Sequence, residues 1–310
     1  KTNNPFFENG ITWSDVGSGN FACRYSDYGF MFDVKGSSMF PDKKLIKYLL
    51  GFMNTKFVSF LMDVFNPTIS FQVGNIKSLP LIIDDKRKQQ IDELVDQNVN
   101  LAKAEWDSYE VSWQFIQHPL IPSGSNCNFY ASLKIQDAYE FWEQLTKERY
   151  EKVKANEIKL NQLFVEIYGL EGELSFDIDD KDITLQRAEV KQDIRSFISY
   201  AVGCMFGRYS LDVESLVYAG GQWDDSKYST FIPDKDNIIP ITDEEYFEDD
   251  IVGLFVAFVK KVYSAETLEE NLDFIAKALG NRGYTSREII RNYFIKDFFK
   301  DHCKIYQKRP

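Results

Sequence analysis

Hydrophobic side chains recur every three or four positions along two long stretches of the chain, a spacing that predicts two long amphipathic helices. The first helix starts near Asp84, and its apolar face is formed by Ile91, Leu94, Val95 and Leu101. The second extends from about Leu133 to Tyr168, where Gly169 suits the left-handed backbone that often follows a helix. Residues 84–170 are therefore expected to form a long-helix spacer.

Strict alternation of apolar and polar residues occurs at residues 69–73, and it predicts a half-buried β-strand. Successive side chains of a strand point to opposite faces. Ser70 and Gln72 would therefore face away from the apolar side, which is formed by Ile69, Phe71 and Val73. Residues 30–34 form a second β-prone run.

A helix is expected between these two strands. Asp42 is a suitable N-cap, and apolar residues follow it at helical spacing. The helix should end before Asn66, because Pro67 disfavours the helical conformation at the residue that precedes it. Residues 1–83 are thus expected to form a mixed segment of strands and helix.

The remainder of the chain, residues 171–310, has a mainly helical pattern. One helix is expected from Arg187 to Tyr209. Capping boxes, in which a threonine precedes a glutamate by three positions, predict helix starts at Thr242, Thr267 and Thr285. The whole pattern predicts an α+β protein: a mixed α/β target-recognition segment at 1–83, the spacer at 84–170 and a mainly helical C-terminal domain at 171–310.

Charge is distributed unevenly along the 310 residues, whose net charge is −12. Residues 1–83 carry eight Lys/Arg against six Asp/Glu, and residues 281–310 carry eight against three, which leaves −19 for residues 84–280. An anionic partner is therefore expected at the two ends. The acidic middle is expected to be mainly solvated surface.

Several classes of protein are disfavoured by simple features. The apolar run at residues 251–259 is too short to span a bilayer, and no basic-then-apolar leader opens the chain. The chain begins at Lys1 rather than Met, which we interpret as a piece cut from a longer polypeptide. Its widely spaced cysteines indicate reduced thiols in a cytoplasm. We therefore expect a cytoplasmic protein without a membrane partner.

Catalytic motifs are absent from the sequence. It contains no G-x-x-x-x-G-K-[ST], G-x-G-x-x-G or G-x-S-x-G pattern. The steps Asn4-Pro5 and Asn66-Pro67 are superficially similar to the N-P-P-Y loop of amino-methyltransferases, but both lack the second proline and are primarily turn formers. Neither His118 nor His302 has a ligand-type neighbour at metal spacing. No catalytic residue, cofactor site or metal site is therefore expected within this chain.

Several segments of the sequence carry a resemblance to a known family. They are residues 45–83, the long helix expected after them, residues 196–211 and residues 298–309. Over essentially its whole length the chain resembles the PglX family, adenine-specific DNA methyltransferases of BREX phage-exclusion systems. The resemblance implies that the catalytic loop and the site for the methyl donor SAM lie upstream in the parent enzyme. The chain itself would be the downstream, target-reading part.

Double-stranded DNA is the partner that this resemblance implies. Base geometry favours Gln for adenine and Arg or Lys for guanine, whereas Lys and Arg also contact phosphates. Ser70 and Gln72 on the expected strand are candidates for a groove, although both also suit a solvated sheet face. The full set of candidate DNA-binding residues is Arg24, Tyr25, Lys35, Lys43, Lys44, Lys47, Ser70, Gln72, Asn75, Lys77, Arg287 and Arg291.

Two alternatives to DNA reading remain open. The acidic residues 84–280 could form a protein-interaction module that docks other BREX proteins or is bound by a phage inhibitor. A stand-alone enzyme is the third possibility, and the missing catalytic motifs disfavour it. For Arg287 and Arg291, which share a helix face, surface charge beside an apolar face is as reasonable a role as phosphate contact.

Overall fold

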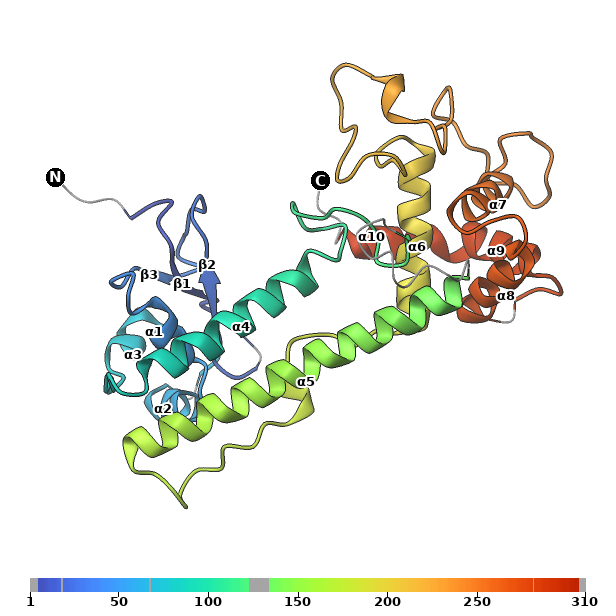
Figure 1. Ribbon diagram of the computed structural model, residues 1–310. Coiled ribbons are helices and arrows are strands. Elements are labelled where there is room, and N and C mark those ends of the chain that lie inside the picture. Colours follow the sequence, from blue (N-terminus) through green and yellow to red (C-terminus); the bar gives the residue numbers. More distant parts are fainter. Residues whose placement is uncertain (1–4, 18, 67, 123–133, 281, 307–310) are drawn as a thin grey trace. The chain divides into compact units, whose positions relative to one another are not determined.

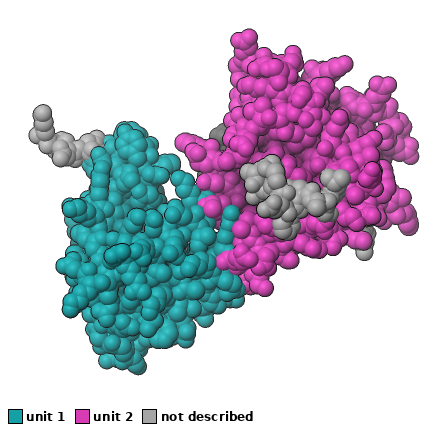
Figure 2. All heavy atoms as spheres, in the orientation of Figure 1, with its two compact units in different colours: residues 1–103, 149–185 teal, residues 104–148, 186–310 magenta. Residues whose placement is uncertain are grey.

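The computed structural model describes residues 5–17, 19–66, 68–122, 134–280 and 282–306, and it has a mixed α+β fold (Figure 1). The chain forms two compact units, coloured separately in Figure 2. Unit 1 comprises residues 1–103 and 149–185, and unit 2 comprises residues 104–148 and 186–310. The α+β prediction is confirmed. The division into three functional segments stays a prediction.

Unit 1 contains a small antiparallel sheet with strand order β2-β1-β3. Its strands are β1 (Gly10–Trp13), β2 (Cys23–Ser26) and β3 (Ser38–Met39). The alternation in β1 gives the sheet an inner face, where Ile11 and Trp13 are buried. On the other face, Thr12 lies opposite both Arg24 and Ser38.

The two strands expected from the sequence are absent, and both predictions are wrong. At residues 69–73 the chain makes a single bridge, between Ser70 and Val16, and then enters the helix α3 (Val73–Lys77). Ile69 and Val73 are exposed, so these residues do not form one apolar face. Residues 30–34 form an exposed loop. Both segments have a β-type sequence pattern, but neither lies beside a strand of the described residues with which it could form a ladder of backbone hydrogen bonds.

The helix expected after Asp42 forms as two helices, α1 (Ile46–Met53) and α2 (Lys56–Phe65). Thr55 separates them because its side chain accepts a hydrogen bond from the backbone N–H of Val58 and so caps α2. The expected end before Asn66 is confirmed. Pro67 lies outside the described residues.

The long helices are confirmed as α4 (Lys88–Trp106) and α5 (Ile135–Tyr168), although α4 begins four residues later than Asp84. Gly169 follows α5 with φ +66°, as expected. Ile91 and Val95 of α4 pack with α1, α5 and the inner sheet face in the core of unit 1. A short 3-10 helix (Asp180–Asp182) also belongs to this unit.

Unit 2 is helical around an aromatic core centred on Phe197, Phe255 and Phe258. Besides the first part of α5 it contains α6 (Val190–Met205), α7 (Ile251–Val262), α8 (Leu268–Leu279), α9 (Ser286–Tyr293), a π-helical segment (Phe294–Phe298), α10 (Phe299–Ile305) and a 3-10 helix (Asp225–Lys227).

One of the three expected capping boxes forms as predicted. The Thr285 hydroxyl accepts a hydrogen bond from the N–H of Glu288 and caps α9. Thr267 precedes α8, but its hydroxyl accepts from the side chain of Asn271 instead. The prediction at Thr242 is wrong, since α7 begins at Ile251. Among the described helices, none is both long enough and apolar enough to cross a bilayer.

Candidate nucleic-acid interface

The outer face of the unit 1 sheet carries small polar side chains and one arginine. The exposed Arg24 of β2 lies beside Thr12 of the central strand β1, which in turn lies beside Ser38 of β3, and facing residues of antiparallel strands share a face. The Arg24 guanidinium donates to the Ser14 hydroxyl at 3.1 Å, and no carboxylate of the described residues pairs with it. Its charge therefore stays available to an anion.

A second polar group adjoins this face at the end of β1, and we call it the Asp15 cluster. It consists of Asp15, Lys35, Asn66, Ser70 and Asn75. One carboxylate oxygen of Asp15 lies 3.6 Å from the Lys35 ammonium, and the other accepts a hydrogen bond from the Ser70 hydroxyl at 3.1 Å. Asn66 then donates its amide hydrogens to the Ser70 carbonyl at 2.6 Å and to Asn75 Oδ1 at 3.2 Å. The structure thus brings three predicted residues together.

Sequence reasoning missed the two residues that organise this cluster. Asp15 was not a candidate, because a lone aspartate after a short strand carries no local signal. Asn66 was expected only to follow the end of a helix and to form a turn, whereas its side chain holds two segments together. An asparagine amide that can both donate and accept is suited to such a junction.

The short helix α3 presents side chains that are not engaged elsewhere. Gln72 precedes the helix and makes no side-chain capping hydrogen bond, and Lys77 lies in its last turn. Both are exposed. Among the described residues, no ion pair involves Lys77 or the exposed Lys44. The side chains of Gln72, Lys77 and Lys44 are therefore free to contact a ligand.

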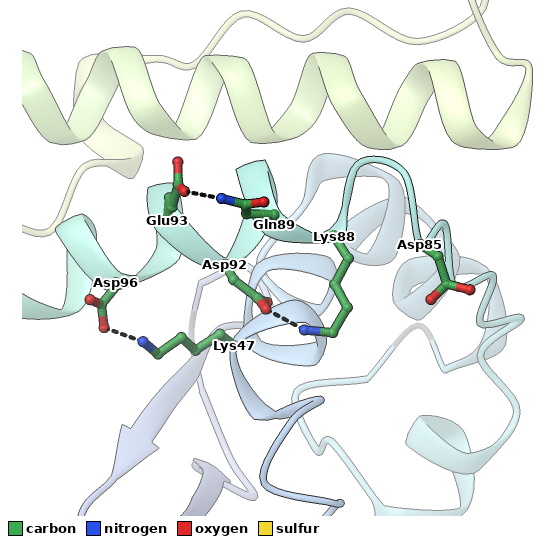
Figure 3. A pocket seen from close by; sticks show the side chains of 7 residues that line it. All are labelled: Lys47, Asp85, Lys88, Gln89, Asp92, Glu93 and Asp96. Atoms are coloured by element: carbon green, nitrogen blue, oxygen red, sulfur yellow. Dashed lines mark hydrogen bonds and ion pairs between the residues drawn. The ribbon is translucent and has the colours of Figure 1, made fainter.

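Three other candidates in unit 1 already have partners. The Tyr25 hydroxyl accepts a hydrogen bond from Asn9 at 2.6 Å. Lys43 lies 3.9 Å from Glu8, a long and exposed pair. Lys47 binds Asp96 of α4 at 2.7 Å and lines a hollow of about 340 Å³ (Figure 3).

This hollow is acidic. Its lining residues are Lys47, Asp85, Lys88, Gln89, Asp92, Glu93 and Asp96. Figure 3 shows Lys88 bound to Asp92 and Gln89 bound to Glu93, so the lining groups bind one another. These lining residues include no aromatic or aliphatic side chain on which an adenine ring could stack. The residues that line this hollow therefore do not fit SAM.

The two predicted arginines of unit 2 hold carboxylates. Arg291 binds Asp250 through two hydrogen bonds of 2.8 Å, and the Asp250 side chain is wholly buried. Arg287 makes a similar two-pronged contact with Glu269 at 2.7 and 2.8 Å, but both side chains are exposed. Arg291 is a structural residue in this geometry, and Arg287 would have to leave its partner to reach a phosphate.

Unit 2 also contains two buried titratable groups. Burial lowers the pKa of His118 to about 3, and the neutral ring accepts from the N–H of Leu120 and bonds the Ser196 hydroxyl at 2.9 Å. Burial raises the pKa of Glu110 to about 7, against the hydrogen bond from Tyr306. Both groups face packed side chains of unit 2, which indicates structural roles.

Three carboxylates gather on one loop of unit 2. Ligand oxygens of Asp234, Asp236 and Asp249 lie within 4.8 Å of one another. Oxygen ligands of this kind suit Mg²⁺ or Ca²⁺. However, the carboxylates of Asp234 and Asp236 already accept backbone N–H groups of the same loop, and nothing else directs a cation there.

Comparison with known proteins finds that the chain is similar to proteins named adenine-specific methyltransferases. It is 42% identical over 308 residues to the adenine-specific methyltransferase PglX of Lacticaseibacillus casei strain Zhang. It is 33% identical over 337 aligned residues to the adenine-specific methyltransferase BrxX of Escherichia coli strain HS. Each match covers 98% of this chain but only 25% and 27% of the relatives, respectively. No family model matches the chain.

Proposed function

We propose that this chain, homologous over 98% of its length to about a quarter of the adenine-specific methyltransferases PglX and BrxX, reads the DNA target for such an enzyme. In this proposal another part of the parent protein binds SAM and transfers the methyl group to adenine. The parent enzyme would modify host DNA in the cytoplasm as part of phage defence.

One observation carries the proposal: free donors of two kinds are collected on unit 1. Arg24, Lys44 and Lys77 are exposed cations without a carboxylate partner among the described residues, and Gln72 is an exposed amide five residues before Lys77. Cations position a protein on phosphates, whereas amides discriminate base edges. A target-reading surface needs both kinds of group.

The division of labour between two regions has a physical reason. An adenine can be methylated on its exocyclic amine only after it leaves the base stack, which costs a few kcal/mol. Contacts to the surrounding duplex offset that free-energy cost. They also determine the DNA sequence at which the base leaves the stack. A reading region therefore contributes to catalysis without holding a reacting group.

Gln72 is the residue to which we assign base reading. A glutamine amide can donate to N7 and accept from N6 of adenine in the major groove. Ser70 and Asn75, the other predicted polar contacts, are engaged within the Asp15 cluster. They would shape the surface around Gln72 and contact a base only after rearrangement.

A salt titration of duplex binding tests this proposal. The 310-residue chain is mixed with a labelled duplex of mixed sequence, and the dissociation constant is measured by fluorescence anisotropy between 25 and 200 mM salt. Each neutralised phosphate contributes about −0.9 to the log–log slope. Arg24→Ala combined with Lys77→Ala should flatten the slope by about 1.8.

The matched control is Arg287→Ala, which removes an exposed arginine that already holds Glu269. It should leave the slope within error of the wild-type value. Absence of duplex binding at the lowest salt, or equal slopes for all three proteins, would count against DNA reading by unit 1.

A second function, protein docking, is supported by one surface of unit 2. Residues 232–249 carry seven acidic groups against one lysine, together with the exposed apolar side chains Ile232, Ile238, Tyr246 and Phe247. Phosphates would be repelled here, whereas a basic protein with apolar contacts would fit. Another protein of the same defence system, or a phage inhibitor, is the partner we propose.

Calorimetry with purified proteins of that defence system tests the docking function. Tyr246→Ala combined with Phe247→Ala should weaken such a complex without changing duplex binding. If none of the purified proteins binds, or if the double variant binds as tightly as the wild type, this surface has no docking role.

A further inference from the structure

The loop between β2 and β3 exposes an unusual amount of apolar surface. Four of its side chains are more than half exposed: Tyr28 at 73%, Phe30 at 54%, Met31 at 66% and Val34 at 80%. Single exposed apolar residues need no explanation, but several within seven residues indicate a binding surface.

Contacts of its middle residues with neighbouring segments hold this loop in place. The N–H of Phe7 donates to the Phe30 carbonyl at 3.2 Å, and the N–H of Gly29 donates to the Phe7 carbonyl at 3.1 Å. The Phe32 ring packs between Phe6 and Phe40, with centroid distances of 5.0 and 5.1 Å. The exposed side chains are thus presented on a fixed backbone, which lowers the entropy lost on binding.

One cation lies within the loop and another on the strand before it, as contact with a polyanion requires. Asp33 accepts hydrogen bonds from the N–H groups of Lys35 and Gly36, and Asp27 lies 3.7 Å from Lys103. The Lys103 ammonium therefore partly offsets the charge of Asp27, whereas the two backbone N–H groups hold the Asp33 carboxylate without neutralising it. Lys35, whose exposed ammonium lies 3.6 Å from Asp15, follows the apolar residues directly, and Arg24, without a carboxylate partner among the described residues, lies on the strand that leads into the loop. In such an arrangement the exposed apolar side chains can contact bases, while the neighbouring cations contact the phosphates of the same strand.

We propose that Tyr28 and Met31 insert into the base stack of the bound duplex as a wedge. The inference rests on the proposed DNA-reading function and extends it. An adenine that leaves the stack exposes the faces of its neighbours, and an aromatic ring or a thioether can cover them. Wedge residues of this kind unstack and kink DNA in other proteins. Tyr28 and Met31 would thus lower the cost of extruding the target base.

A topology assay tests the wedge without knowledge of the recognised sequence. A closed circular plasmid is relaxed by topoisomerase I in the presence of saturating 310-residue chain at low salt, and the topoisomers are resolved on a gel. Insertion of side chains unwinds the duplex, so the wild type should shift the linking number. Tyr28→Ala with Met31→Ala should abolish the shift and weaken duplex binding about tenfold.

Two further variants distinguish a wedge from loss of structure. Tyr28→Phe with Met31→Leu keeps an apolar wedge and should retain the shift. Tyr284→Ala removes a 99% exposed tyrosine of unit 2 and should behave as wild type.

The outcomes separate this inference from the function on which it rests. Duplex binding without a wild-type shift, or a full shift in the double alanine variant, overturns the wedge and leaves DNA reading intact. Absence of duplex binding overturns both.

Discussion

The carboxylate of Asp250 receives both terminal nitrogens of Arg291 at 2.8 Å and also caps helix α7 through the N–H groups of Val252 and Gly253. Burial by itself raises the pKa of Asp250, but the hydrogen bonds from Arg291 and the two backbone groups lower it overall. One buried carboxylate thus links the start of α7 to α9, 41 residues further along the chain.

Removal of Arg291 should destabilise the protein strongly. Arg291→Ala leaves the buried Asp250 carboxylate without its cation, which typically costs about 3–5 kcal/mol of unfolding free energy. Arg287→Ala breaks an exposed pair of the same geometry and should cost less than about 1 kcal/mol. Urea denaturation of both variants measures the difference. Similar losses for the two would show that burial does not govern this pair.

Burial of the neutral His118 ring should make the unfolding free energy decrease at acidic pH. Its folded-state pKa of about 3 is below the ordinary 6.5, so the unfolded chain binds a proton that the folded state excludes. Stability is complete above pH 6.5 and should fall between pH 6.5 and 3, by up to about 1.4 kcal/mol per pH unit. His118→Gln should remove this part of the pH dependence in urea denaturation. An unchanged dependence would assign the acid sensitivity to other groups.

Glu110 should act in the opposite direction. Its pKa of about 7 in the folded state exceeds the ordinary 4.5, so its contribution is complete below pH 4.5 and is lost as pH rises to 7. Glu110→Gln keeps the shape of the side chain and should flatten stability over that window. NMR titration of the carboxyl carbon provides a direct check, and a midpoint near 4.5 would contradict the prediction.

Substitution of two helical glycines by alanine should change the stability of the protein in opposite directions. A Cβ at Gly203 would lie 2.6 Å from the buried Tyr209 ring, so Gly203→Ala should cost about 1–3 kcal/mol. At Gly253 a Cβ would meet only the Glu245 carboxylate at 3.5 Å, and helix propensity predicts a gain of about 0.5 kcal/mol. Thermal melts of the pair measure the difference.

Gln72 should influence site choice in an intact methyltransferase that contains this region. Gln72→Ala should leave the melting temperature unchanged, because the side chain is exposed and makes no capping bond. It should relax the preferred base at one position of the methylated site, which amounts to about 1–3 kcal/mol of discrimination. Sequencing of methylated adenines reads this out. An unaltered motif would remove Gln72 from the reading surface.

Much of the helical framework could be predicted because its signals are local. The periodicity of α4 and α5 persists over many turns, and Gly169 marks the end of α5 without reference to any distant residue. The Thr285 capping box likewise involves neighbours along one turn. Local patterns did not predict the β-strands. The strand β1 is only four residues long, and it is defined by its pairing with β2 and β3, which lie elsewhere in the chain.

For the candidate site, the sequence by itself determined which residue types were present and that the chain is related to the PglX methyltransferases. Only the tertiary structure decided which of the predicted cations are free: Arg24 has no carboxylate partner among the described residues, whereas Lys47 meets Asp96 and Arg291 meets Asp250. The physical reason is that a charge is compensated through space. Neither pair has a local pattern that predicts it, because its members come from helices far apart in sequence.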